Sequence, residues 1–313
     1  MTACSFVPAA TQMIYDMNLQ SQLLGVTFEC PPRALSEKPK IVRSPIEGKK
    51  LNSSEINRIF SASKASRKSL YYVDEALLKQ IQPDVIFTQD TCDICQIDTA
   101  CTEAVVASLE KRPLIIPLNP TNLQEVCQTA ITIATALGQE ASANRYLSAL
   151  QTITESIQSR LLEHHRQPKK VMLIEWMEPI YNCGHWIPFQ ITRAGGTDML
   201  SNPGGHSIAT AWEEIVKYNP EMLVIAPCGF SVERTKKELH RLTRNPHWKT
   251  LQAVKSGQVH IADAALFTQP SASTLTDGIQ LLAALLHPTL FTVPAHLREK
   301  FTSYQRQTSY VQA

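Results

Sequence analysis

Sulfur, imidazole, carboxylate and aromatic side chains recur in short loops between the apolar runs of this sequence. These residue types bind metal ions, stack on flat ligands, or act as nucleophiles and proton carriers. The segments that carry them are Glu29–Cys30, Gln89, Cys92–Cys95, Glu175–Trp176, Tyr181–Trp186 and Cys228–Phe230.

The cysteines offer the first candidate site. Cys92 and Cys95 form a Cys-x-x-Cys pair, which by itself is compatible with metal contact, redox work or a structural loop. If Cys30 and Cys228 share the same cleft, four thiols would favour a soft metal ion. A metal site at Cys30, Cys92, Cys95 and Cys228 is therefore a prediction, with a structural loop as its alternative.

The aromatic and imidazole groups offer a second candidate site. Trp176 and Trp186 are placed in loops by their neighbours, which favours contact with a flat apolar ligand over a place in the core. His185 either binds a ligand or caps a helix. Cys4, Cys101 and Cys127 lie in apolar or helical surroundings, where cysteine packs as a small hydrophobe.

Catalytic motifs are missing. The sequence has no Gly-x-Gly-x-x-Gly, no Walker-type Gly-Lys-Ser/Thr, no Gly-x-Ser-x-Gly and no His-Glu-x-x-His, and no carboxylate pair stands out. We therefore assign no catalytic residue. Binding without turnover is favoured over an enzyme.

Composition narrows the class further. The 313 residues are 43% hydrophobic and 19% charged, with a formal net charge of +2, which is typical of a globular protein and gives no basic footprint for nucleic acid. No run reaches the ~18 apolar residues of a membrane span. The eight cysteines and the lack of an export signal predict free thiols and a cytoplasmic location, or a periplasmic one if the sequence begins after a removed signal.

The apolar runs alternate with helical patterns in both halves of the chain, which predicts βαβ units with parallel sheets. Because ligands bind beyond the carboxyl ends of parallel strands, the loops above fall on the predicted functional edges. The expected strands are 4–7, 23–28, 84–87, 114–117, 171–174, 222–226 and 259–262. The expected helices are 53–61, 73–81, one ending near 110, 185–194, 212–218, 232–242 and 276–286.

A long helical segment separates the halves. Residues 122–165 contain no proline and one glycine, Gly138, which predicts two helices, the second about 27 residues long. A spacer between two lobes is favoured over a coiled-coil arm, since fewer than four heptads are present.

The chain as a whole resembles a known family. The segments that carry the resemblance are Ser5–Thr11, Ser69–Glu75, Pro83–Gln89, Cys92–Cys95, Gly184–Pro188, Ala194–Gly196 and Ala226–Phe230. They are similar to the cobalamin-binding-protein branch of the class III periplasmic binding proteins, a superfamily that includes the cobalamin, iron-siderophore and haem carriers of ABC importers.

The resemblance implies an α/β fold of two Rossmann-like lobes with central parallel sheets, joined by a long interlobe helix, with the ligand in the cleft. The expected domains are residues 1–121, the helical segment 122–168, residues 169–290 and a polar tail from 291 to 313. Transport members dock on a permease through a glutamate on each lobe, for which Glu75 is a candidate only in the first lobe. At 266–270 the family's aromatic-Phe-x-Arg-Pro pattern is replaced by Leu-Phe-Thr-Gln-Pro, so permease docking is not predicted.

These observations predict a non-enzymatic binding protein for a small molecule, either a corrinoid or another metal-bearing or planar ligand. A cleft-thiol or metal-dependent enzyme and a metal-binding scaffold or partner subunit are the alternatives. Corrinoid, haem and a soft divalent metal are the cofactors considered, and no nucleic-acid partner is expected. The predicted ligand contacts are Tyr71, Gln89, Cys92, Cys95, Glu175, Trp176, His185, Trp186, Cys228 and Phe230.

Overall fold

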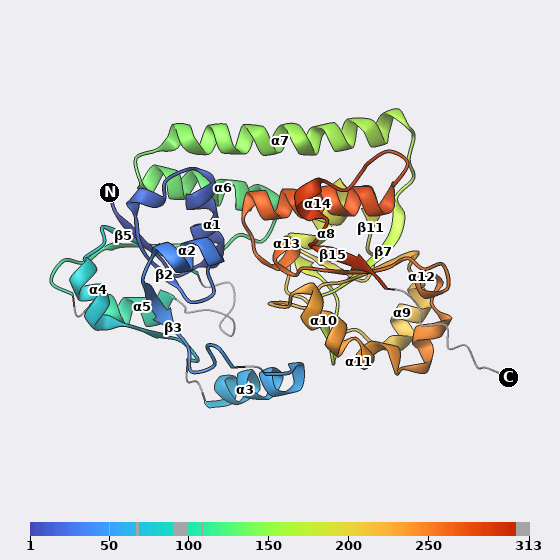
Figure 1. Cartoon of the computed structure of the whole chain (residues 1–313), viewed down its shortest axis with the longest axis horizontal. Coiled ribbons are helices and arrows are strands. Elements are labelled where there is room, and N and C mark those ends of the chain that lie inside the picture. Colours follow the sequence, from blue (N-terminus) through green and yellow to red (C-terminus); the bar gives the residue numbers. More distant parts are fainter. Residues whose placement is uncertain (50, 67–68, 90–98, 108, 305–313) are drawn as a thin grey trace. The chain divides into compact units, whose positions relative to one another are not determined.

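The computed structural model describes residues 1–49, 51–66, 69–89, 99–107 and 109–304. The chain divides into two compact units (Figure 1). Unit 1 contains Met1–Gln151 and the short segment Pro270–Ser273, and unit 2 contains Thr152–Gln269 and the described residues from Thr274 onward.

Unit 1 is built around a sheet with the strand order β4-β3-β2-β1-β5-β6 among the described residues. All neighbours are parallel except β3 and β4, which are antiparallel. Its strands are β1 (Ala3–Ser5), β2 (Leu23–Thr27), β3 (Lys40–Arg43), β4 (Tyr72–Val73), β5 (Val85–Thr88) and β6 (Leu114–Pro117). Its helices are α1 (Pro8–Asp16), α2 (Pro32–Glu37), α3 (Ser53–Ser66), α4 (Glu75–Ile81), α5 (Thr99–Val106) and α6 (Leu123–Ala136), with the 3-10 turn η1 (Gln20–Gln22).

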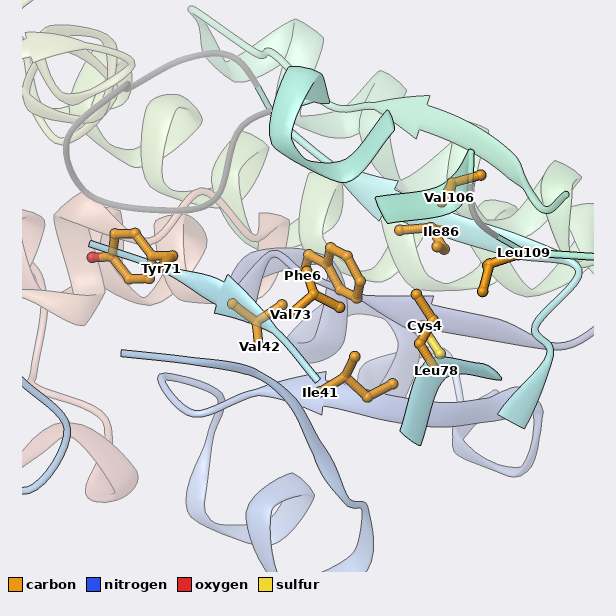
Figure 2. Close-up of a cluster of buried hydrophobic side chains, with 10 residues drawn as sticks. All are labelled: Cys4, Phe6, Ile41, Val42, Tyr71, Val73, Leu78, Ile86, Val106 and Leu109. Atoms are coloured by element: carbon orange, nitrogen blue, oxygen red, sulfur yellow. The ribbon is translucent and has the colours of Figure 1, made fainter. Parts of the chain in front are cut away.

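The strands of unit 1 are apolar because helices cover the sheet. Every residue of β1 and β5 is buried, as expected for strands enclosed on both faces. Figure 2 shows the core cluster on one side of this sheet, where Phe6 and Ile86 meet side chains from β3, β4, α4 and α5. Pro8 begins α1 after the two residues that follow β1, and proline suits this position because the first helical turn leaves its N–H groups without helical partners.

Helix α7 (Glu140–Glu163) connects the two units as one continuous helix of 24 residues (Figure 1). Gly138 separates it from α6 and adopts φ +69°, a left-handed conformation that glycine adopts at helix ends without steric cost. The prediction of two helices broken at Gly138 is confirmed.

Unit 2 contains a second sheet, with the order β11-β7-β13-β14-β15 among the described residues. Its strands are parallel except for β15, which runs antiparallel to β14. The strands of the unit are β7 (Lys169–Ile174), β8 (Trp176–Met177), β9 (Ile180–Tyr181), β10 (Gly184–His185), β11 (Gly196–Thr197), β12 (Asn202–Pro203), β13 (Met222–Ile225), β14 (Val259–Ala262) and β15 (Phe301–Ser303). Its helices are α8 (Ile187–Arg193), α9 (Trp212–Tyr218), α10 (Val232–Glu238), α11 (His240–Thr243), α12 (Gln252–Lys255), α13 (Ala265–Thr268) and α14 (Ala272–Leu286), with η2 (Pro246–Thr250) and η3 (Ala295–Leu297).

Some boundaries differ from the sequence expectation. Val73 belongs to β4, and α4 begins at Glu75, two residues later than expected, because Asp74 caps the helix by accepting the Leu77 N–H. The expected helix at 232–242 is two helices, α10 and α11. The sequence does not predict β15, which begins inside the expected polar tail.

Two further local expectations need correction. The helix expected from His185 begins at Ile187, because His185 pairs in β10 with a left-handed φ of +51°. Cys127 is exposed rather than packed, since it lies beside the buried stripe of α6 that includes Val126 and Ala130. The side chain of Cys101 lies outside the described residues.

The fold class itself is confirmed: the chain is α/β, with mainly parallel sheets covered by helices. Over the described ranges, no helix is both long enough and apolar enough to traverse a bilayer.

Candidate functional site

The candidate site of unit 2 begins at the carboxyl end of β7. There the chain turns at Glu175 and forms the short hairpin of β8 and β9, in which Trp176 pairs with Tyr181. The Glu175 N–H donates to the carbonyl of Tyr181 at 3.1 Å, and the Cys228 N–H donates to the Glu175 carbonyl at 3.0 Å. The loops after β7 and β13 are therefore joined through one residue.

A close backbone crossing follows the hairpin. Strand β10 pairs in parallel with β12, and the His185 N–H donates to the Gly205 carbonyl at 2.6 Å. A Cβ on Gly184 would lie 2.4 Å from that same carbonyl oxygen. The residue before His185 must therefore be glycine for the two strands to approach this closely.

His185 is held rigidly at this crossing. Its ring stacks on Trp186 at 5.3 Å between centroids, and it meets the ring of His206 edge-on at 5.0 Å. Its Nδ1 atom is buried without a hydrogen-bond partner, and burial, followed by the nearby His206, lowers the pKa of the imidazole. His185 is therefore neutral at pH 7, a form in which imidazole binds metal ions.

Trp186 differs from the expectation of a loop side chain facing a ligand. Its ring is buried, with 6% exposed, and its indole N–H donates to the Phe267 carbonyl at 2.6 Å. Gln190 also donates to the backbone of this region, at the Leu266 carbonyl. Trp186 is therefore a core residue, because its indole N–H is bonded inside the unit. Its ring also packs against one face of the His185 ring.

An aromatic and cationic stack forms a second feature of unit 2. Trp176 is half-buried and packs edge-on against Phe230, with 5.4 Å between centroids. The guanidinium of Arg234 lies 3.6 Å from the centroid of the Phe230 ring. Phe230 is therefore covered by its own neighbours, and Trp176 is the member of the stack that remains partly accessible.

The carboxyl of Glu175 stabilises the loops around His185. It accepts a hydrogen bond from the Gly184 N–H at 3.2 Å and another from the Ser207 side chain. Burial raises the pKa of this carboxyl to about 7. The residue before Gly184, Cys183, donates its thiol hydrogen to Asp198 at 3.6 Å. One acidic side chain therefore contacts both segments that carry the two histidines.

Three predicted site residues belong to unit 1 and lie at the carboxyl edge of its sheet. Tyr71 immediately precedes β4 and stacks against Phe28, which follows β2, at 6.1 Å. Gln89 follows β5 and is buried. The thiol of Cys30 donates to the Thr11 hydroxyl at 3.1 Å, and burial raises its pKa to about 12.

The four-cysteine metal site stays a prediction. Cys92 and Cys95 lie outside the described residues, while Cys30 and Cys228 belong to different units, Cys30 buried and Cys228 exposed. Within the described part of the chain, no group of three or more His, Cys, Asp or Glu side chains is arranged to hold a metal ion.

The sequence does not single out several residues that the structure brings to this site. They are His206, Ser207, Asp198 and Arg234. The Gly204-Gly205 pair ahead of His206 is the one local signal, since paired glycines mark a tight turn or a close backbone approach.

The structure thus contains two α/β units, each with polar and aromatic loops at the carboxyl edge of its sheet, an architecture used by ligand-binding α/β proteins. The chain belongs to the periplasmic binding protein family, whose sequence profile matches residues 75–266, more than half of its length. The predicted family resemblance is therefore confirmed.

Individual relatives are distant in sequence. The putative ABC transporter substrate-binding lipoprotein YhfQ of Bacillus subtilis is 24% identical over 189 residues, which cover 56% of this chain and 58% of that protein. A periplasmic heme binding protein from Pseudomonas aeruginosa matches with a TM-score of 0.70 at 14% identity, over 98% of this chain and 99% of its own. The periplasmic vitamin B12 binding protein BtuF of Vibrio cholerae matches with a TM-score of 0.62 at 16% identity, over 91% and 96%.

The names of these relatives can be compared with the predicted cytoplasmic location of the protein. One is described as a lipoprotein and the other two as periplasmic. The prediction of a cytoplasmic protein therefore has no support among them.

Proposed function

We propose that this chain is the substrate-binding protein of an ABC import system and that its ligand carries a metal ion. Membership of the periplasmic binding protein family supports the binding role. The names of the relatives, which include a transporter lipoprotein and proteins for heme and vitamin B12, support both the transport role and a metal-bearing ligand. A location outside the cytoplasmic membrane and docking on a permease are parts of this proposal.

The observation that carries the metal-bearing ligand is the unbonded imidazole of His185. Neither ring nitrogen makes a hydrogen bond to the described residues, although Nδ1 is buried and the backbone is fixed in the left-handed region. A buried polar atom without a partner costs about 1–3 kcal/mol, so its retention in a member of a ligand-binding family supports a functional role for this imidazole. Because Nδ1 is enclosed, Nε2 is the ring nitrogen that a ligand's metal could reach, and no hydrogen bond from the described residues occupies it.

Three buried thiols among the described residues are poorly suited to nucleophilic chemistry. Burial raises the pKa of Cys4, Cys30 and Cys183, so these thiols stay protonated near neutral pH and are poor nucleophiles. The cleft-thiol enzyme that the sequence leaves open would use Cys92 or Cys95, which lie outside the described residues.

A ligand screen on the purified full chain tests the proposal. Hemin, hydroxocobalamin, a ferric siderophore and NiCl2 are added separately, and binding is followed by thermal shift and visible absorption. We expect at least one of these probes to bind, with a stabilisation of about 2.7 kcal/mol at a hundredfold excess over Kd.

The matched variants are His185→Asn and His240→Asn. Asparagine tolerates the left-handed backbone of residue 185 and therefore preserves the fold there. His240 is exposed on α11 and serves as the control. We expect His185→Asn to weaken binding at least tenfold and His240→Asn to leave it unchanged; a chain that binds none of the four probes contradicts the proposal.

A further inference from the structure

The centroid separation of His185 and His206 falls in the range of two imidazoles that share a metal ion. The two ring centroids are 5.0 Å apart and the ring planes are perpendicular. With metal–nitrogen bonds of about 2.1 Å and a centroid about 1.1 Å behind each nitrogen, two imidazoles bound at 90–110° have centroids about 4.5–5.2 Å apart. Two imidazoles on opposite sides of one metal would have centroids about 6.4 Å apart on the same bond lengths.

The backbone holds both histidines in this relation without a ligand. The Gly204 N–H donates to the His185 carbonyl at 2.9 Å, and the Asn202 N–H donates to the Cys183 carbonyl at 2.9 Å. The side chain of Asn202 donates to the His206 carbonyl at 2.8 Å. The backbone at each histidine is therefore fixed by the segment that carries the other, which is part of the preorganisation that a binding site requires.

The side chains of Glu175 and Trp186 make further contacts with the two segments that carry the histidines. Glu175 accepts from Gly184, the neighbour of His185, and from Ser207, the neighbour of His206. Trp186 supports the face of the His185 ring. These contacts resist rotation of the two loops against each other.

The pair is only part of a coordination sphere. No third His, Cys, Asp or Glu within the described ranges joins it to complete a metal-binding group. The remaining positions must therefore be filled by water or by the ligand itself, because first-row ions take four to six donors.

We infer that His185 and His206 together bind one first-row divalent metal ion through two adjacent coordination positions, so that the metal arrives bare or in an open, non-macrocyclic chelate. A haem or corrin ring occupies the four positions in its plane and leaves only two opposite ones, which a pair of rings 5.0 Å apart does not match. This inference rests on the proposed function and narrows its ligand class.

Calorimetric titration of the full chain tests the pair, with NiCl2 alone in one arm and Ni²⁺ with equimolar citrate in the other. We expect one Ni²⁺ per chain in at least one arm, with the Kd weakened at least tenfold by His185→Asn and by His206→Asn. His240→Asn is the matched control. Tighter binding in the citrate arm identifies an open chelate as the source, and tighter binding in the other arm identifies the bare ion.

The Co²⁺ complex gives a second measurement that a structural role would not move. Each coordinated imidazole keeps one exchangeable N–H whose proton signal is shifted far downfield by the paramagnetic ion. Wild type should show two such signals, and each single variant one. Circular dichroism of the variants without metal checks that both remain folded.

Two results would overturn the inference. Ni²⁺ binding that is lost in His185→Asn but unchanged in His206→Asn shows that the two rings only pack together. Binding of hemin or hydroxocobalamin that requires His185 alone, with no Ni²⁺ bound, leaves the proposed function standing and removes the adjacent pair. Failure of every metal-bearing probe removes both.

Discussion

At the scale of single residues, the sequence identifies one half of the candidate site. His185 follows a buried strand and lies beside Trp186, and this position alone makes it a ligand candidate. His206 cannot be found in the same way, because its role depends on a backbone crossing between segments about twenty residues apart. Gly184 and Gly205 make that crossing sterically feasible, but a glycine pattern does not state its partner.

The burial of the aromatic residues could also not be predicted from the sequence. Trp176 and Trp186 have similar sequence surroundings, yet Trp176 is half-buried and Trp186 donates its indole N–H to a core carbonyl. The difference arises from the position of the Phe267 carbonyl on α13, about eighty residues away. Sequence patterns report which side chains are apolar, and only the tertiary structure decides which of them are enclosed.

His260 provides a residue-scale prediction for pH. It is buried in β14 with Nε2 unpartnered and Nδ1 3.1 Å from the Ser303 hydroxyl on β15. Burial lowers its pKa to about 4, below the value of about 6.5 in an unfolded chain. The unfolded state therefore binds the proton first, and stability present above pH 6.5 is lost as the pH falls toward 4.

The expected loss from His260 is about 2 kcal/mol between pH 7 and pH 5. Urea unfolding at the two pH values measures it in wild type, in His260→Leu and in the surface control His240→Leu. The pH dependence should shrink in His260→Leu alone. An unchanged dependence in that variant would show that His260 accepts a proton in the folded state.

At the scale of elements, periodicity predicts the long segments well. The break at Gly138 and the length of α7 follow from helical spacing and one left-handed glycine. The two-residue strands β8, β9, β10 and β12 are not predicted, because two residues carry no alternation for a pattern to detect. These short strands position the candidate site, so the site is less predictable than the sheets that support it.

Three helices contribute residues of unit 1 to one hydrogen-bonded cluster. The Ser273 N–H donates to the Tyr146 hydroxyl at 2.8 Å, and that hydroxyl donates to Asp16 at 3.1 Å. The Ser273 hydroxyl also donates to Asp16, at 2.5 Å. Helix α1, helix α7 and the start of α14 are therefore joined through a single tyrosine oxygen.

Removing that oxygen should destabilise unit 1 locally. Tyr146→Phe leaves the Ser273 amide without an acceptor and removes one donor from Asp16, which we expect to cost about 1–2 kcal/mol. Tyr15→Phe is the matched control, because the Tyr15 hydroxyl makes an exposed hydrogen bond to Glu37, and the loss of that bond should cost less than about 0.5 kcal/mol. Urea unfolding gives both values, and amide exchange should quicken at Ser273 only in Tyr146→Phe. Equal costs in the two variants would contradict the role of the cluster.

At the scale of the whole molecule, the two units are not successive pieces of chain. The chain enters unit 2 within α7, returns to unit 1 for Pro270–Ser273, and leaves it again along α14. The alternation of strands and helices predicts two α/β halves. The same alternation does not predict that Pro270–Ser273 belongs to unit 1. Four residues are too few to show a pattern, and tertiary contacts such as those of Ser273 assign them to that unit.

The shared connections should make the two units unfold together. All four tryptophans, Trp176, Trp186, Trp212 and Trp248, belong to unit 2, so their fluorescence reports that unit alone, while far-ultraviolet circular dichroism reports both. In wild type the two urea transitions should coincide, as in a two-state protein. In Tyr146→Phe unit 1 is weakened selectively, so dichroism should begin to fall at a lower urea concentration than fluorescence changes. Transitions that are already separate in wild type would show that α7 and the returning segment do not couple the units.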